Sequence, residues 1–95
     1  MDKRRFADIE LDFPVEINGT KVRAVRMRRP TVRDELAFQD AKGSAAKKAV
    51  DLLASLCELA PNDLLGMDAA DFSKLEAQYG AFRGASPSKS SGEPS

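Results

Sequence analysis

The side chains of this chain that could do chemistry are five arginines spaced closely between residues 23 and 33. A β-ribbon that carries guanidinium groups at this density could contact the phosphates of a nucleic acid. The alternative is structural: carboxylates on a neighbouring strand pair with these arginines and neutralise them. A net charge of zero favours the structural alternative, because nucleic-acid affinity depends largely on phosphate neutralisation. The five residues are Arg23, Arg26, Arg28, Arg29 and Arg33.

Catalytic and metal-binding side chains are scarce. The chain has no histidine, which removes the commonest general base and the commonest transition-metal ligand. Asp68 and Asp71 lie three residues apart without further ligands at a recognised spacing, so we interpret them as helix-capping residues. The single cysteine, Cys57, lies on an apolar side of a predicted helix, and we interpret it as an inert buried thiol. We therefore expect a binding module without catalytic activity, metal or cofactor.

Residues 9–29 are predicted to form a β-hairpin. Apolar and polar residues alternate from Ile9 to Ile17, and Asn18-Gly19 is the preferred pair for a two-residue type I′ turn. Pro14 indicates that the first strand is an edge strand. The apolar pattern of the second strand changes phase, which predicts a β-bulge near Ala24 and Val25. That bulge would pair Phe13 with Val25, Leu11 with Met27, Glu16 with Lys21, Asp12 with Arg26, and Glu10 with Arg28.

Three main helices are predicted after the hairpin, over about residues 32–41, 45–60 and 69–82. The expected N-caps are Thr31, Ser44 and Asp68. Pro61 is expected to end the second helix. A short turn over residues 62–66 should then fold Leu64 and Leu65 back onto the core. The predicted fold class is α+β: a two-stranded antiparallel hairpin packed on three main helices.

The chain is long enough for one small domain, which we place at residues 9–83. A flexible basic arm (1–8) is expected before it and a disordered tail (84–95) after it, because nine of those twelve tail residues are Ser, Gly or Pro. The longest apolar run has three residues, so no membrane span is expected. A core of about 80 residues is marginal, which leaves self-association open.

Charge is distributed unevenly along the chain. Residues 1–33 carry nine bases and five acids, whereas residues 34–95 carry six bases and ten acids. The basic hairpin and the acidic helical part are therefore expected to form different layers. A lone cysteine cannot form an internal disulfide, which fits a reducing cytoplasm.

The order of these features resembles the Mu-type tail assembly chaperones of tailed bacteriophages. The resemblance covers roughly residues 9–82 and starts with the hairpin and its Asn18-Gly19 turn. It continues with a "basic, basic, Pro-Thr, two residues, Asp" stretch that joins the hairpin to the first helix, and with Asp71-Phe72 in the last helix. The joining stretch reads Met27-Arg28-Arg29-Pro30-Thr31-Val32-Arg33-Asp34.

The resemblance implies a non-enzymatic protein of the bacterial host cytoplasm that is not part of the mature virion. Such proteins bind the apolar, helix-rich tape measure protein and keep it soluble until tube subunits polymerise around it. Many also exist as a longer, frameshifted form that recruits the tail tube protein. A small nucleic-acid-binding or regulatory module that uses the basic hairpin is the alternative function.

A chaperone of this kind needs exposed apolar surface. The 45–60 helix has an unusually wide apolar arc, and the last helix carries an aromatic stripe at helical spacing. We expect these two helices to supply the partner-binding residues, some of which also serve the core. The candidates are Leu52, Leu56, Phe72, Tyr79 and Phe82.

Overall fold

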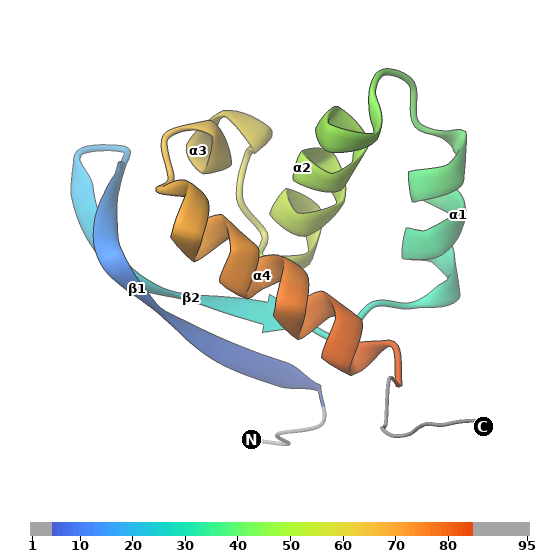
Figure 1. Ribbon diagram of the computed structural model, residues 1–95, viewed down its shortest axis with the longest axis horizontal. Helices are drawn as coiled ribbons and strands as arrows, with labels where there is room; N and C mark the ends of the chain where they lie inside the picture. Colours follow the sequence, from blue (N-terminus) through green and yellow to red (C-terminus); the bar gives the residue numbers. More distant parts are fainter. Residues whose placement is uncertain (1–4, 85–95) are drawn as a thin grey trace.

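The computed structural model describes residues 5–84 and confirms the α+β fold class (Figure 1). An antiparallel hairpin is followed by helices, of which α4 lies alongside the hairpin and α1 lies at the far end of the molecule. Residues 1–4 of the expected arm and residues 85–95 of the expected tail lie outside the described residues. The elements are β1 (Phe6–Ile17), β2 (Thr20–Arg28), α1 (Val32–Asp40), α2 (Ala45–Leu56), α3 (Pro61–Leu65) and α4 (Ala69–Phe82).

The hairpin turn follows from its two central residues. Asn18 has a φ of 53° and Gly19 a φ of 80°, the left-handed conformation that a type I′ turn requires at both positions. Beside the turn, Glu16 pairs with Lys21 as predicted. The strand begins three residues earlier than expected, because Phe6, Ala7 and Asp8 already pair with β2.

The hairpin does contain an irregularity, but it lies on β1, so the predicted bulge at Ala24–Val25 is wrong. Between the pairs Glu10–Ala24 and Val15–Val22, β1 has four residues where β2 has only Arg23. Pro14 lies in this segment and has no N–H to contribute to a ladder, which favours the irregularity on its own strand.

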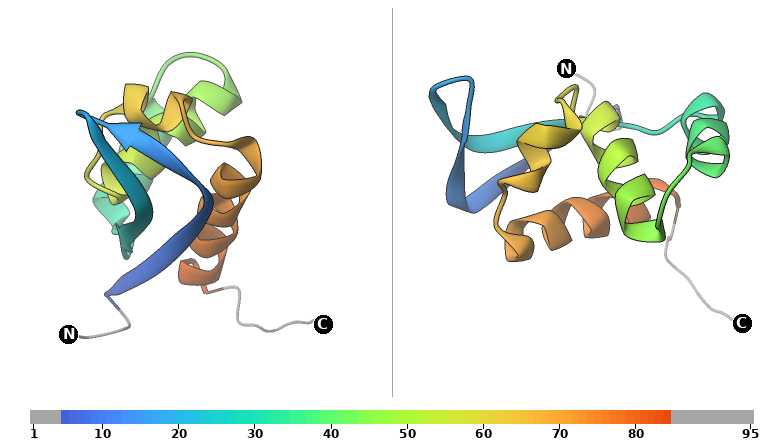
Figure 2. Two further views of the ribbon diagram at one scale, coloured as in Figure 1. Left: turned by 90° about the vertical axis from the view of Figure 1, so that its left-hand side faces the viewer. Right: turned by 90° about the horizontal axis from the view of Figure 1, so that it is seen from above.

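The irregularity changes the register of the remaining ladder. The four predicted pairs beyond it are wrong, because every partner on β1 lies four positions closer to the N-terminus than expected. The observed pairs are Ile9–Val25, Ala7–Met27, Asp8–Arg26 and Phe6–Arg28. The hairpin is strongly curved, and α4 runs along its β1 side (Figure 2).

The core lies between the curved hairpin and the helices. β1 contacts α4 and β2 contacts α2, and α2 is central because it also contacts α1, α3 and α4. The largest apolar side chains that are fully buried are Met27, Leu53, Leu56 and Leu75.

Helix α2 ends at Leu56, which is earlier than predicted, and Pro61 does not end it. Glu58 adopts the left-handed conformation with a φ of 57°, and its amide donates to the carbonyl of Ser55 at 3.1 Å. The amide of Leu59 donates to the carbonyl of Ala54 at 2.8 Å. These two bonds form a Schellman motif, which satisfies the last carbonyls of the helix.

Pro61 instead begins helix α3, where its missing N–H is not needed. The expected turn over residues 62–66 is therefore largely helical. Leu64 is buried as expected, but Leu65 is 68% exposed, so the expectation that Leu65 folds onto the core is wrong.

Replacing Glu58 with glycine is expected to stabilise the protein by about 1 kcal/mol, because a side chain in the left-handed region costs about 1–2 kcal/mol and glycine avoids this cost. Urea denaturation followed by circular dichroism measures the change. Glu58→Ala is the matched control: it removes the same charge but keeps a Cβ in the strained conformation. Equal stability of the two variants would show that backbone strain at this cap is negligible.

Candidate functional site

The stretch from Arg28 to Asp34 acts as a latch between the hairpin and the first helix. The Arg28 guanidinium donates from Nη1 to Asp34 Oδ2 at 2.7 Å and from Nη2 to Asp34 Oδ1 at 2.9 Å. Such two-bond arginine–carboxylate pairs fix orientation as well as distance. The latch thereby holds the end of β2 against the first turn of α1.

Asp34 also completes the N-terminal cap of α1. Its Oδ2 accepts from the backbone N–H of Thr31 at 2.8 Å, while the Thr31 hydroxyl accepts from the Asp34 amide at 3.4 Å. The Arg28 guanidinium, together with the Thr31 donors, holds the pKa of the Asp34 carboxyl well below its usual range. Arg28 and Asp34 of the motif therefore have a structural role.

Asp71 has a structural role that the sequence did not reveal. Asp68 caps α4 as predicted, accepting from the Ala70 amide at 2.9 Å. Asp71 is fully buried, and its two oxygens each accept a backbone N–H from the β1 irregularity, from Asp12 and from Phe13, at 2.9 Å. Burial alone would raise the pKa of Asp71, but these two bonds and the neighbouring Lys74 lower it. The charged carboxylate thus anchors the irregular segment of β1 to α4.

The five arginines do not gather into one phosphate-binding surface. Arg26 pairs with Asp8 at 2.9 Å, and Arg28 pairs with Asp34, so carboxylates neutralise them as expected but from other positions than predicted. Arg29 lies over the ring of Phe82 at 5.4 Å. Arg23 and Arg33 are exposed.

The described residues contain no group of three or more side chains that could hold a metal ion. Cys57 is buried, and burial raises the pKa of its thiol to about 11. At neutral pH the thiol is therefore protonated and a poor nucleophile.

The structure divides the five partner-binding candidates into two groups. Leu52, Leu56 and Phe82 are buried in the core. Phe72 and Tyr79 are half-buried and keep part of their surface exposed. The second group is accordingly better placed for partner contact, and the first supports the helices that present it.

Large exposed apolar side chains occur where the sequence reading did not place them. Val32 and Leu36 lie on the outer face of α1, and Phe13 lies in the β1 irregularity. Leu65 borders an apolar groove of about 320 Å³ between α2 and α3, which we call the α2–α3 groove. Its lining is Ala46, Lys47, Val50, Asp51, Pro61, Asn62 and Leu65. The available sequence signal was the unusually wide apolar arc of the 45–60 helix, which includes Ala46 and Val50.

Tyr79 reports on the packing of α4 against α1. Its hydroxyl donates to Glu35 Oε2 at 2.7 Å, and burial together with this carboxylate raises the pKa of Tyr79 to about 12. Because the chain has one tyrosine, ultraviolet absorbance during alkaline titration follows Tyr79 alone. We expect its midpoint to lie clearly above that of the unfolded chain in urea. Stability should decline from about pH 10 upward, since the folded pKa is the higher one.

The control for this titration is Glu35→Gln, which keeps a side-chain acceptor but removes the negative charge. It should shift the midpoint of Tyr79 down toward the ordinary value of 10.0. An unchanged midpoint in this variant would show that Glu35 does not influence the phenol.

Most of the chain matches the model of a known protein family. Residues 8–84 match the family model described as "Phage tail assembly chaperone proteins, E, or 41 or 14". No curated protein and no solved structure matches the chain. No helix among residues 5–84 is long and apolar enough to cross a membrane. The matched segment includes the hairpin from Asp8 onward, the Arg28–Asp34 latch and helices α1 to α4, and the chain therefore belongs to the phage tail assembly chaperone family.

Proposed function

We propose that this chaperone binds the tail tape measure protein, keeps it soluble in the host cytoplasm and helps recruit tail tube subunits. Membership of the family supports a role in tail assembly. The observation that carries the proposal is the exposed apolar surface at the α2–α3 groove, where Leu65 is 68% exposed. An exposed apolar groove suits one face of an amphipathic or apolar helix, which the groove would shield from water.

The proposed partner-contact residues are of two kinds. Val50 and Leu65 would contact the partner at the groove, and Phe72 and Tyr79 would add contact from α4. Leu52, Leu56 and Phe82 would contribute indirectly, because they are buried and hold α2 and α4 in place. This division gives the groove the rigid support that a binding surface requires.

We further propose that the chaperone acts without catalysis and does not remain in the finished virion. A longer form that continues beyond the chain by translational frameshifting would recruit the tube protein.

Co-expression with the tape measure protein tests the proposal, and Leu65→Asp is the informative variant. We expect the parent chain to raise the soluble yield of the tape measure protein several-fold, and Leu65→Asp to lose most of that gain. The physical reason is that a carboxylate in an apolar interface must give up its hydration on binding.

Leu36→Asp is the matched control, because Leu36 is 57% exposed on α1 and lies outside the α2–α3 groove. It should retain the activity of the parent. If both variants retain it, the groove is not the contact surface. If the parent itself fails to raise the soluble yield and forms no complex, tape measure binding is wrong for this pair.

A further inference from the structure

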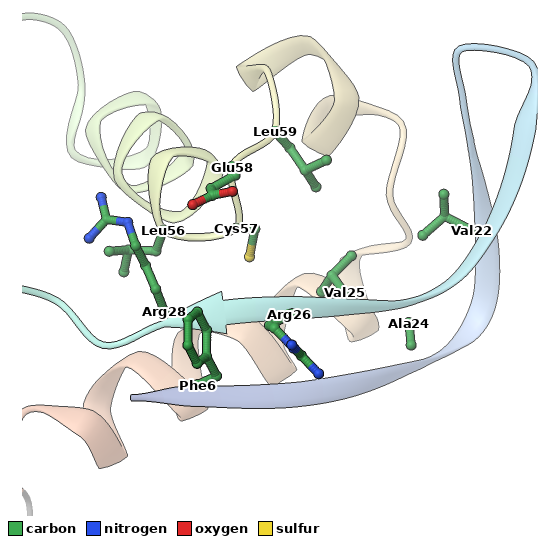
Figure 3. A pocket seen from close by; sticks show the side chains of 10 residues that line it. All are labelled: Phe6, Val22, Ala24, Val25, Arg26, Arg28, Leu56, Cys57, Glu58 and Leu59. Carbon is green, nitrogen blue, oxygen red and sulfur yellow. The ribbon is translucent and has the colours of Figure 1, made fainter. Parts of the chain in front are cut away.

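Two neighbouring hollows follow the side of β2 that faces the α2–α3 connection. The first, of about 250 Å³, lies between β2 and residues 56–59 (Figure 3). The second, of about 320 Å³, lies between Arg5 and the β2–α1 connection. Both are lined by Phe6 and Arg28, so they adjoin and form one surface, which we call the β2 groove. It shares no residue with the α2–α3 groove.

The two ends of the β2 groove differ in chemistry. At one end the lining side chains are largely apolar, with Val25 and Leu59 near the buried thiol of Cys57 and Val22 farther along β2. At the other end the lining includes the exposed residues Arg5 and Arg29. One end can therefore take an apolar side chain and the other a carboxylate.

The walls between these ends are held in place by ion pairs and ring contacts. Arg28 is fixed by Asp34, and Arg26 is held by Asp8 while lying over the ring of Phe6 at 5.5 Å. Arg29 lies over the ring of Phe82 at 5.4 Å. Guanidinium groups oriented in this way lose little conformational freedom when they bind a carboxylate.

We propose that the β2 groove binds a short acidic–apolar segment of a second partner protein, in addition to the tape measure binding proposed above. Charge complementarity supports this occupant: the groove is lined by one carboxylate, Glu58, and by four arginines, of which Arg26 and Arg28 are paired with Asp8 and Asp34 and the other two are Arg5 and Arg29. Glu58 borders the apolar end, so the carboxylates of the segment bind at the end formed by Arg5 and Arg29. An apolar side chain of the same segment fills the hollow between β2 and Leu59.

The dimensions and charges favour a peptide over a nucleic acid. Hollows of about 250 and 320 Å³ match side chains. Specific nucleic-acid interfaces bury about 1,000 Å² or more of protein surface and need many cationic contacts to phosphates. Here Arg26 and Arg28 are already paired with Asp8 and Asp34, and Glu58 borders the same surface.

A random library of twelve-residue peptides displayed on phage tests the proposal with the full chain as bait. We expect the enriched peptides to combine Asp or Glu with a large apolar residue. Their synthetic versions should bind about tenfold or more weakly to the double variant Arg5→Glu/Arg29→Glu, measured by fluorescence anisotropy. The matched control is Arg23→Glu/Arg33→Glu, which changes the net charge equally at two arginines outside the groove. It should bind within about twofold of the parent, since remote surface charges are screened.

Circular dichroism melting of both double variants establishes that they are folded. Enriched peptides without acidic residues, or equal losses in both double variants, would overturn the proposal. Tight binding of a 20-base-pair DNA duplex to the parent, with no acidic peptide recovered, would overturn the proposal and indicate that the groove binds nucleic acid. A concentration-dependent dimer that is lost only in Arg5→Glu/Arg29→Glu, with no acidic peptide recovered, would also overturn the proposal and indicate that the groove binds a second copy of this chain. Because these variants leave Leu65 unchanged, failure here is distinguishable from failure of tape measure binding.

Discussion

Replacing Leu53 with alanine is expected to lower the free energy of unfolding by about 2–5 kcal/mol. Leu53 is only 2% exposed and lies in α2, the helix that contacts α1, α3, α4 and β2. The truncation leaves a cavity where several elements meet, and no single element can move to fill it without disturbing the others. For a domain of this size, such a loss is a large share of the total stability.

Urea denaturation followed by far-ultraviolet circular dichroism measures this loss, and Leu65→Ala is its control. Both changes shorten a leucine in a helix of the same chain, but Leu65 is 68% exposed. Its variant should stay within about 0.5 kcal/mol of the parent. A Leu53→Ala variant that unfolds at the urea concentration of the parent would show that position 53 does not support the core.

Short-range signals allowed much of the fold to be predicted from the sequence. The Asn18-Gly19 turn depends on the backbone preferences of two residues. The caps at Thr31, Ser44 and Asp68 depend on side chains that bond amides two or three positions away. All the physics that decides such features lies within a few residues, so a single sequence is sufficient to find them.

The strand register could not be predicted in the same way, because one of its causes is remote in the sequence. Asp71 bonds the amides of Asp12 and Phe13 across 59 and 58 positions of the chain. This contact stabilises an irregularity on β1, whereas the local apolar phase pointed to β2. Charge pairing was likewise predicted in kind but with wrong partners, since partner choice follows from the register.

The candidate site was predictable only in part. The stretch from Arg28 to Asp34 and the residue Asp71 carried the resemblance to the family, and the structure assigns both to architecture. The exposed surface was harder to find, because α2 ends at Leu56 and α3 then turns Leu65 outward. Apolar periodicity tells which residues share a helix face, but the direction of that face depends on the packing of the other helices.

Replacing Asp34 with alanine is expected to destabilise the protein by about 3 kcal/mol. The change removes both hydrogen bonds to Arg28 and leaves that half-buried guanidinium without its carboxylate. It also removes the acceptor for the Thr31 amide at the start of α1. Asp51→Ala is the control, because it removes the exposed pair with Lys47 and should cost about 0.5 kcal/mol or less. Similar losses of stability in the two variants would contradict a stabilising role for the Arg28–Asp34 latch.

The same residue predicts how stability depends on pH. The folded protein holds the pKa of Asp34 below its ordinary value of 3.8, so the charged form is favoured by folding. Its contribution is fully present above about pH 4 and is lost as the pH falls below that value. The lowered pKa values of Asp8 and Asp71 act in the same direction, so the parent alone does not isolate Asp34. Asp34→Asn does isolate it, because asparagine keeps the shape and does not titrate. Urea denaturation of both proteins at several acidic pH values should show their stabilities converging as the pH falls, and parallel curves would exclude Asp34 as a titrating contributor.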